Sequence, residues 1–546
     1  MELGVMLTPE RIAAMEARGD WAGKTTLDYL DAAVARNPDR AAVIAHDSEA
    51  GTETTLTYAE LDRVARRIAL GLLELGVAPG DVVSFQLPNW WQFTALHLAC
   101  IHVGAISNPL MPIFRTRELR FMLGFAESKV YVAPQRFRGV AYPAMMADLA
   151  HALPHLAHCF YIGGEEPQSF ERFFLETARP DAPEMLTARR TGANDVTQIL
   201  YTSGTTGQPK GVMHTANTLF ACLPPIVERF GMGADDVTWM ASPLAHQTGF
   251  MYGIMLPIML GVPAVLRDVW VPAEAAASMA ATGATFTMAS TPFLADLADL
   301  PTLAAHDLSR FRIFLSAGAP IPSALVERAT ERLGAHVLSG WGMTELGCIT
   351  NCAPGDPPEK IFGTDGKALP GSEVKVVRAD GTEAPRGEEG ILKCRPNALF
   401  VGYLKRPEVY GVDDDGWFDT GDYARMDEDG YLRITGRAKD IIIRGGENVP
   451  VVEVEELLYR HPAVRECAVV AMPDARLGER ACAFVGLVEG GTLDYAGMVA
   501  HLRASGMATQ YFPERLVVRD ALPRTPSGKI QKFVLREEAK GFTAER

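Results

Sequence analysis

The stretch "YTSGTTGQPKGVMHT", Tyr201 to Thr215, decides how this chain is interpreted. It places hydroxyl side chains and glycines around a single charge, Lys210, between the apolar runs "ILYT" and "GVMH". Both runs have the composition of buried strands, so we predict that the segment joins them as a hairpin. Glycine tolerates close approach of a ligand, and hydroxyl and backbone N–H groups donate to phosphate oxygens. The stretch therefore predicts a phosphate cradle.

This cradle differs from the common P-loop. Its pattern, GxxGxxKG, has a different spacing, and no Ser or Thr follows Lys210. A surface turn without a ligand is the alternative, and it is disfavoured because a long hydroxyl-rich segment links two apolar strands.

Composition places the chain among large globular proteins. With 546 residues, 48% of them hydrophobic, it is too long for one core, and we expect a large multi-part domain plus a smaller one. The net charge of −15 disfavours a broad nucleic-acid-binding face. Eight cysteines without a CxxC pair predict neither a zinc site nor a disulfide framework.

Neither the N-terminus nor the interior predicts membrane insertion. The first residues lack the charge and apolar pattern of a signal peptide. The uncharged run 249–266 contains Pro257 and Pro263, which favours buried structure over a membrane span. We expect a soluble, cytoplasmic protein.

Apolar periodicity predicts an α/β fold. An amphipathic helix within 55–77 precedes a strand in 81–89, and a helix is expected through 93–110. Strands and helices alternate again across 262–320. This order is typical of layered α/β structure with largely parallel sheets.

The pattern changes after about residue 355. Short β runs are separated by Asp-Gly turns at 380–381, 415–416 and 429–430, which predicts a hairpin-rich, β-barrel-like subdomain at about 355–436. A second α/β unit follows. We therefore expect an N-terminal domain at 1–438, a boundary at Lys439 and a C-terminal domain at 440–546.

Five motifs in register extend along the chain. They are "YTSGTTGQPKG" (201–211), "GWGMTE" (340–345), "DTGD" (419–422), "GRAKDIIIRGGENV" (436–449) and "PRTPSGKIQK" (523–532). In order and spacing the chain resembles the adenylate-forming superfamily, which includes acyl-CoA synthetases, peptide-synthetase adenylation domains and luciferases. The resemblance covers essentially the whole chain. It implies an ATP-dependent carboxylic acid–CoA ligase with a mobile C-terminal domain.

The resemblance assigns the ATP phosphates and a Mg²⁺ ion to two motifs. Thr344 matches the α-phosphate donor, and Glu345 matches the Mg²⁺ ligand, although a helix-cap role for this carboxylate is the alternative. The β- and γ-phosphates are assigned to Thr202, Ser203, Gly204, Thr205, Thr206, Gly207 and Lys210.

The resemblance assigns the adenine and ribose of ATP to other segments. Trp341 stands where the family has an aromatic residue against adenine, and Gly342 follows it. The turn with Gly318 and Ala319 would line the base. Asp422 matches the acid that accepts the ribose hydroxyls, and Arg437 a further ribose contact.

The C-terminal motifs imply two reaction states. Lys529 matches the lysine that contacts the carboxylate and the α-phosphate during adenylation. Lys439 matches the hinge about which the small domain turns for thioester formation. Gly445 and Gly446 would then let the pantetheine arm of CoA pass close to the backbone.

The acyl pocket is expected around "SPLAHQTGF" (242–250). This stretch contains no acidic residue to pair with an α-amino group, which favours a non-amino acid. We assign His246, Phe250, Met251, Thr291 and Trp341 to the pocket, with a catalytic or gating role for His246. A core histidine is the alternative. The N-terminal half also resembles ligases for cyclohexanecarboxylate and similar acids, which favours an alicyclic, aromatic or terpenoid substrate.

Other functions remain open at this point. The chain is expected to carry no fused carrier domain after Lys529, so the acceptor is free CoA or a separate carrier protein. A luciferase-like oxygenase and a non-catalytic nucleotide sensor would share the motifs. A serine hydrolase is disfavoured because no GxSxG elbow is present. Both a monomer and a homodimer fit the sequence.

Overall fold

The computed structural model of the chain describes residues 2–202, 209–318, 321–437, 440–445, 447–525 and 528–545. Several predicted site residues lie outside these ranges and remain sequence predictions: Ser203, Gly204, Thr205, Thr206, Gly207, Ala319, Lys439 and Gly446.

The first α/β layer is a six-stranded sheet. Its order is β10 (Lys210–Thr215), β9 (Val196–Thr202), β4 (Ile106–Pro109), β3 (Val82–Phe85), β5 (Val130–Pro134) and β8 (His158–Ile162). The strands from β9 to β8 run parallel, whereas β10 is antiparallel to β9. A short pair, β6 (Arg136–Phe137) and β7 (Val140–Ala141), stands apart.

The second layer is a nine-stranded sheet. Its order is β17 (Lys367–Ala368), β16 (Gly347–Asn351), β15 (His336–Met343), β14 (Ile313–Ser316), β13 (Phe286–Ala289), β11 (Thr238–Met240), β12 (Ala264–Arg267), β1 (Ala41–Asp47) and β2 (Thr52–Thr57). The strands from β15 to β1 are parallel, so the predicted parallel α/β architecture is confirmed. One large hydrophobic core joins the two sheets.

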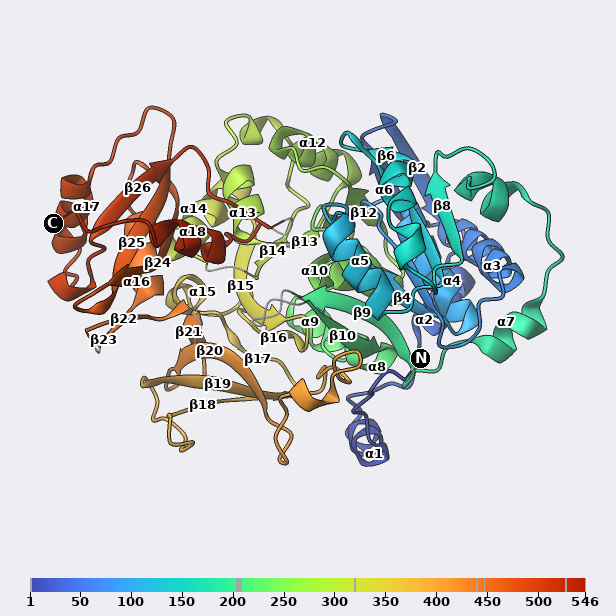
Figure 1. Cartoon of the computed structure of the whole chain (residues 1–546), viewed down its shortest axis with the longest axis horizontal. Coiled ribbons are helices and arrows are strands. Elements are labelled where there is room, and N and C mark those ends of the chain that lie inside the picture. Colours follow the sequence, from blue (N-terminus) through green and yellow to red (C-terminus); the bar gives the residue numbers. More distant parts are fainter. Residues whose placement is uncertain are drawn as a thin grey trace.

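Helices cover the sheets and fill the space between them (Figure 1). The N-terminal part contains α1 (Pro9–Ala17), α2 (Thr26–Arg36), α3 (Tyr58–Glu74), α4 (Trp91–Val103), α5 (Thr116–Phe125), α6 (Tyr142–Ala147), α7 (Pro183–Arg189), α8 (Ala216–Phe220), α9 (Leu223–Arg229), α10 (Gln247–Phe250), α11 (Leu256–Leu260), α12 (Pro272–Thr282), α13 (Thr291–Ala298), α14 (Ser323–Leu333) and α15 (Pro358–Gly363). A π-helix, η3 (Met251–Met255), connects α10 to α11.

The helix predicted through residue 110 was too long. Helix α4 ends at Val103 because Gly104 adopts a left-handed conformation with φ of 74°. A Cβ at this position would lie 2.7 Å from the Arg189 carbonyl oxygen, so only glycine fits. The residues that follow form strand β4, whose four residues are all buried.

A third, antiparallel sheet corresponds to the hairpin-rich region. Its order is β18 (Ser372–Val377), β19 (Glu389–Pro396), β20 (Phe418–Met426) and β21 (Leu432–Arg437). The antiparallel hairpins are confirmed, and the sheet is open, since no pairing joins β18 to β21 among the described residues. Its core contains Trp341, from the end of the second sheet.

The C-terminal unit has a sheet and core of its own. Strands β23 (Glu447–Val449), β22 (Ile442–Arg444), β25 (Gly478–Leu487) and β24 (Val464–Asp474) pair in that order, and β26 (Arg515–Arg519) pairs with β25. Helices α16 (Val451–Tyr459), α17 (Tyr495–Ala504) and α18 (Lys532–Ala539) belong to the same unit. The predicted second α/β unit is thus present.

The C-terminal unit lies against α13 and α14 of the larger part (Figure 1). The hydroxyl of Ser323, at the start of α14, donates to Glu456 on α16 over 2.7 Å. Tyr459 of α16 packs against the core around α13 and α14. A search of the described helices for a long apolar segment able to cross a bilayer finds none.

Candidate active site

The hairpin predicted from the opening stretch is present. Strands β9 and β10 are antiparallel, and Lys210 pairs with Thr202 at the end of the ladder where the chain passes from β9 to β10. Residues 203–208 between them are not described, so the phosphate cradle itself stays a prediction. The register nevertheless places Thr202 and Lys210 side by side where that segment begins and ends.

Tyr403 connects two of the predicted phosphate-site residues. Its hydroxyl donates to Glu345 Oε1 over 2.8 Å, and Lys210 Nζ lies 4.4 Å from the centroid of its ring. Tyr403 is 3% exposed and Glu345 6% exposed. Burial and the neighbouring carboxylate raise the pKa of Tyr403, so its hydroxyl keeps its proton and acts as a donor.

Tyr403 was not predicted from the sequence, where its one local signal is the pattern "GYL" after an apolar run. An isolated bridge between Val212 and Tyr403 ties this residue to strand β10. The hairpin and the segment after β19 are thereby joined. Tyr403 is consequently held beside Lys210 by backbone contacts as well as by its ring.

Thr344 is positioned by a histidine that the sequence analysis did not identify. His214 Nε2 lies 2.7 Å from the Thr344 carbonyl oxygen, and His214 Nδ1 lies 2.9 Å from Thr218 Oγ1. Burial lowers the pKa of His214 to about 4, so the ring is neutral at pH 7. A neutral ring that donates from Nε2 and accepts at Nδ1 satisfies both contacts. His214 thus connects β10 to the motif that carries Thr344.

Trp341, Asp422 and Arg437 form a second cluster. The Trp341 indole N–H donates to Asp422 Oδ2 over 2.8 Å, and Arg437 Nε forms an ion pair with Oδ1 at 3.0 Å. Asp422 is 2% exposed. Within the described residues Oδ1 accepts no hydrogen bond, and its contact with Arg437 is an ion pair. The cluster therefore offers a buried carboxylate oxygen with acceptor capacity left for a hydroxyl ligand.

Lys529 extends from the C-terminal unit to the end of strand β14. A Cβ added at Gly318 would lie 3.3 Å from Lys529 Cε and 3.7 Å from Nζ. Gly318 has a φ of 88°, which also favours glycine. The ammonium group thus lies over the backbone that follows β14, where the adenine-lining turn was predicted.

The loop that carries Lys529 is fitted to α13. A Cβ at Gly528 would lie 2.7 Å from Ser290 Oγ, and it would also contact Pro292 and Phe293. Thr291, assigned to the acyl pocket, is the first residue of α13 and is buried. The Lys529 backbone N–H donates to Thr525 Oγ1 over 3.0 Å. The lysine loop therefore sits at the carboxyl end of β13 by close backbone packing.

His246 lies within electrostatic reach of Lys529. Burial and the charge of Lys529 lower the pKa of His246 to about 3, so its ring is neutral at pH 7. Its Nδ1 accepts from the Thr248 backbone N–H over 3.3 Å and caps α10. A neutral histidine in this place can line a pocket without repelling the lysine.

Phe250 and Met251 are buried in the core between the two main sheets. Trp341 belongs to the separate core of the third sheet. The structure thus groups His246, Phe250 and Met251 on adjoining helical turns, and it places the Trp341 side chain with the predicted ribose acid. Gly342 lies against a neighbouring strand, because a Cβ there would be 2.1 Å from the Gly347 carbonyl oxygen.

The predicted CoA contact Gly445 follows β22 at the surface of the C-terminal unit. Its φ is 61°, which favours glycine, and Leu477 Cδ2 would lie 3.2 Å from an added Cβ. Gly445 therefore lies on the hairpin of β22 and β23.

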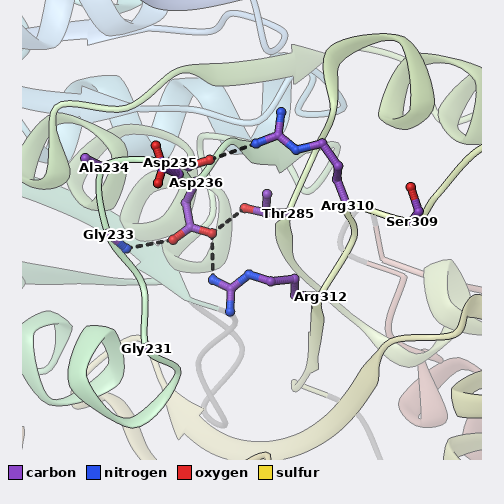
Figure 2. A pocket seen from close by; sticks show the side chains of 9 residues that line it. All are labelled: Gly231, Gly233, Ala234, Asp235, Asp236, Thr285, Ser309, Arg310 and Arg312. Carbon is purple, nitrogen blue, oxygen red and sulfur yellow. Dashed lines mark hydrogen bonds and ion pairs between the residues drawn. The ribbon is translucent and has the colours of Figure 1, made fainter.

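A cavity of about 370 Å³ lies at the amino ends of strands β11, β13 and β14 in the second sheet (Figure 2). Asp236 within it accepts hydrogen bonds from Thr285 and from Arg312, at 2.6 and 2.7 Å. Thr285 precedes β13, whereas Ser290 follows it, so the cavity and the lysine loop are at opposite ends of this strand. Of the predicted residues, Thr291 follows β13 and Gly318 follows β14, so both lie at the carboxyl end of this sheet, where parallel α/β sheets usually bind ligands.

Comparisons with known proteins agree with this geometry. A family model described as AMP-binding enzyme matches residues 30–404, and the model of its C-terminal domain matches residues 453–529. The chain is 36% identical to a medium-chain fatty-acid–CoA ligase of Escherichia coli K12 over 98% of this chain and 94% of that protein.

Two further similarities extend the comparison. The chain is 32% identical to the 3-[(3aS,4S,7aS)-7a-methyl-1,5-dioxo-octahydro-1H-inden-4-yl]propanoyl:CoA ligase of Rhodococcus jostii RHA1, over 89% of this chain and 95% of that protein. The crystal structure of the anthranilate CoA ligase AuaEII with anthranoyl-AMP superimposes with a TM-score of 0.85 at 26% identity, covering 95% of this chain and 98% of that one. The chain belongs to the AMP-binding enzyme family of acyl-CoA synthetases and related adenylate-forming ligases.

Proposed function

We propose that the protein is an ATP-dependent carboxylic acid–CoA ligase that acts in two steps. The acid and ATP first form acyl-AMP and pyrophosphate, and the acyl group then passes to the thiol of CoA with release of AMP. The observation that carries this proposal is the position of Lys529. Its side chain extends from the C-terminal unit to Gly318 and lies in the electrostatic environment of His246.

In the first step a carboxylate oxygen attacks the α-phosphorus, and the bond to the bridging oxygen of pyrophosphate breaks. Two anions must approach, so a fixed cation lowers the barrier. We assign this role to Lys529, which keeps its proton throughout. Thr344 is assigned as the hydroxyl donor to the α-phosphate, and the His214 contact holds its backbone in place.

ATP would be held by the remaining clusters. The segment from Thr202 to Lys210 is assigned to the β- and γ-phosphates, and Asp422 to the ribose hydroxyls. Glu345 suits Mg²⁺, which is usually bound by one or two carboxylates together with substrate phosphates. The hydrogen bond from Tyr403 would keep the Glu345 carboxylate oriented for such an ion.

The second step needs a different arrangement of the C-terminal unit. The thiol of CoA attacks the acyl carbonyl carbon, and the bond to AMP breaks. Lys529 occupies the space near Gly318 in the present arrangement, so thioester formation would follow a rotation at Lys439. Gly445 and Gly446 would then border the pantetheine arm.

The proposed substrate is a carboxylic acid without an α-amino group, of alicyclic, aromatic or terpenoid type. The helical turns that carry His246, Phe250 and Met251 contain no carboxylate to pair with an ammonium group. The printed names of the relatives include a fatty-acid ligase, an anthranilate ligase and a ligase for a fused-ring propanoic acid. Each of these acids carries an apolar chain or ring, which fits the largely apolar pocket proposed here.

The test combines a substrate screen with a lysine variant. Pyrophosphate release is measured over short, medium, aromatic and alicyclic acids, with and without CoA. Release with thioester formation supports the proposal. Release without thioester would instead indicate a separate carrier protein as acceptor, and absence of release with every acid would contradict the proposal.

Lys529→Ala is expected to reduce acyl-AMP formation at least about a hundredfold, because the cation at the reacting phosphate is lost. Thioester formation from supplied acyl-AMP and CoA is expected to be preserved. Lys540→Ala is the matched control, since Lys540 forms an exposed ion pair with Glu537. Equal loss of both half reactions in Lys529→Ala would contradict its assigned role.

A further inference from the structure

Within the described part of the chain, several buried polar side chains near the candidate reacting centre have no hydrogen-bond partner. Gln198 is fully buried, and neither its amide nitrogen nor its amide oxygen is bonded to a described residue. The same holds for His97 Nε2, Thr94 Oγ1 and Gln247 Oε1. Most buried polar atoms in proteins have a partner, so several unsatisfied groups together call for a ligand or bound water.

The first two of these side chains face the same space. Gln198 on β9 is in register with Ser107 on the parallel strand β4, so both side chains project from one face of the sheet. His97 Nδ1 lies 2.9 Å from Ser107 Oγ. His97 therefore covers the face from which Gln198 projects, and its other ring nitrogen remains available.

Thr94 lies on the same helix as His97, and Gln247 lies on a helix that contacts His97. Thr94 lies three residues before His97 on α4, on the same side of the helix. The ring of His97 lies 4.7 Å from the ring of Phe250, which ends the short helix that Gln247 begins. These contacts bring Gln198 and His97 to one face of the first sheet and place the short helix that begins with Gln247 beside His97.

This place borders the predicted reaction site on two sides. Gln198 pairs across the hairpin with His214, whose Nε2 contacts the Thr344 carbonyl oxygen. Gln247 directly follows His246, whose pKa is lowered in part by the charge of Lys529. An acid with its carboxylate between Thr344 and Lys529 would extend toward the unsatisfied groups.

The local backbone supports a binding role. The π-helix η3, Met251–Met255, starts immediately after α10. Such segments are uncommon and are frequently found at functional sites, because their extra residue per turn disturbs regular packing. Here the π-helix adjoins the turn that presents Gln247.

The four side chains are uncharged and together offer both hydrogen-bond donors and acceptors. An amide group offers donors and an acceptor, a hydroxyl offers both, and one imidazole nitrogen offers one or the other. Burial lowers the pKa of His97 to about 3, so its ring is neutral at pH 7. A carboxylate or an ammonium group would have no countercharge among these four residues.

We propose that Gln198, His97, Thr94 and Gln247 form a polar end of the acyl pocket that binds an uncharged oxygen substituent of the substrate, a hydroxyl or keto group remote from the carboxylate. This inference rests on the proposed function and specifies the substrate class. Acids that carry such a group satisfy the buried amide, whereas hydrocarbon acids of equal size leave it unpaired.

The experiment compares acids that differ only in one oxygen. The pairs are cyclohexanecarboxylate with its 4-oxo and 4-hydroxy derivatives, and octanoate with 7-oxooctanoate. For each acid, kcat/KM is measured from pyrophosphate release in the presence of CoA. We expect the intact protein to prefer the oxygenated member of at least one pair by about tenfold or more.

Gln198→Met is the decisive variant, because Met has a similar length and forms no comparable hydrogen bond. It is expected to abolish the preference by lowering kcat/KM for the oxygenated acid about 10- to 100-fold. The hydrocarbon acid should react at least as well as before. The melting temperature should rise or remain equal, since an unsatisfied buried amide is removed.

Thr197→Val is the matched control. Thr197 is the preceding residue of β9, and its hydroxyl is also buried and unbonded, but it projects from the opposite face of the sheet. The control should retain the preference for oxygenated acids. A loss in Thr197→Val equal to that in Gln198→Met would contradict a local contact with the substrate.

Two further results would overturn the inference. Equal kcat/KM for both members of every pair would show that the unsatisfied groups hold only water. A parallel loss for both acids in Gln198→Met, with a lower melting temperature, would show a structural role. Either result leaves pyrophosphate release intact, whereas failure of the proposed function would abolish release for every acid.

Discussion

Tyr403 contacts two of the groups that we assign to ATP and Mg²⁺. Its hydroxyl donates to Glu345 and its ring lies beneath the ammonium group of Lys210. A hydrogen bond to a buried carboxylate fixes its orientation, and a cation over an aromatic ring is stabilised without a countercharge. Both groups are thereby held ready before ATP binds.

Tyr403→Phe is therefore expected to weaken the use of Mg²⁺ while leaving the ring under Lys210. The lost bond to a charged acceptor corresponds to about 1.5–3 kcal/mol, or roughly a 10- to 100-fold loss in kcat/KM at limiting Mg²⁺. Initial rates of pyrophosphate release are measured across Mg²⁺ concentrations. Tyr410→Phe, which removes a hydroxyl that donates to the Phe400 carbonyl oxygen, is the control. An unchanged Mg²⁺ dependence would argue against the assignment.

Gly318→Ala tests the approach of Lys529 to the backbone. The new methyl group would lie 3.3 Å from Lys529 Cε, and the φ of 88° would strain the alanine. The rate of adenylation is expected to fall about tenfold or more, because a small displacement of a catalytic group strongly lowers the reaction rate. Thioester formation from supplied acyl-AMP should be less affected.

The control for this variant is Gly334→Ala, at the end of α14. Its φ of 62° imposes similar strain, but nothing lies within 4 Å of the added Cβ. Both variants should lose similar thermal stability, and only Gly318→Ala should lose adenylation. Matching rates in the two variants would mean that strain alone explains the effect.

At the scale of elements, helix α16 holds the C-terminal unit in its present arrangement. Glu456 accepts from Ser323 over 2.7 Å and from Arg433 over 3.2 Å, and both partners belong to the larger part. Burial acts to raise the pKa of Glu456, but the Ser323 hydroxyl and the charges of Arg433 and Arg460 lower it below its usual value. The carboxylate is thus ionised and shared across the boundary between the units.

Glu456→Gln is expected to shift the units away from the adenylation arrangement. Loss of the charge weakens the Arg433 contact by about 1 kcal/mol, which corresponds to roughly a fivefold lower population of that arrangement. Adenylation should slow accordingly, and thioester formation from acyl-AMP should be equal or faster. Glu453→Gln, on the exposed side of the same helix, should leave both half reactions unchanged. Equal slowing of both steps in Glu456→Gln would refute the shift.

At the scale of the whole molecule, buried histidines make stability depend on pH. Burial lowers the pKa of His97 and His246 to about 3 and that of His214 to about 4, below the usual 6.5. In the unfolded chain these rings bind protons below pH 6.5, and in the folded chain they do not. These rings therefore cost no free energy of unfolding above pH 6.5, and the free energy of unfolding falls as the pH decreases from 6.5 toward 4.

Each of these rings contributes about 1.4 kcal/mol of lost stability per pH unit well below pH 6.5. Melting temperatures are measured between pH 7.5 and 5. His214→Gln should reduce the slope, because the amide can keep one neutral hydrogen bond without titrating, and His336→Gln, at an exposed position, should not. A slope unaffected by His214→Gln would contradict the mechanism.

Much of the fold around the candidate site could be predicted from local sequence. The hairpin between Thr202 and Lys210, the strand–helix alternation and the Asp-Gly turns all follow from patterns spanning a few residues. The end of α4 was misplaced because the left-handed Gly104 interrupts a run that remains apolar. The strand after it continues the same composition in a different conformation, and composition alone does not separate the two.

The sequence by itself determined the α/β architecture, the order of its motifs and the family to which they belong. Those features depend on residue periodicity and on spacing along the chain. Only the tertiary structure decided that Tyr403 bonds to Glu345, that Lys529 reaches Gly318 and that Gln198 is buried with no hydrogen-bond partner among the described residues. Such contacts join segments far apart in the chain, and they arise from the packing of whole layers, for which no short pattern exists.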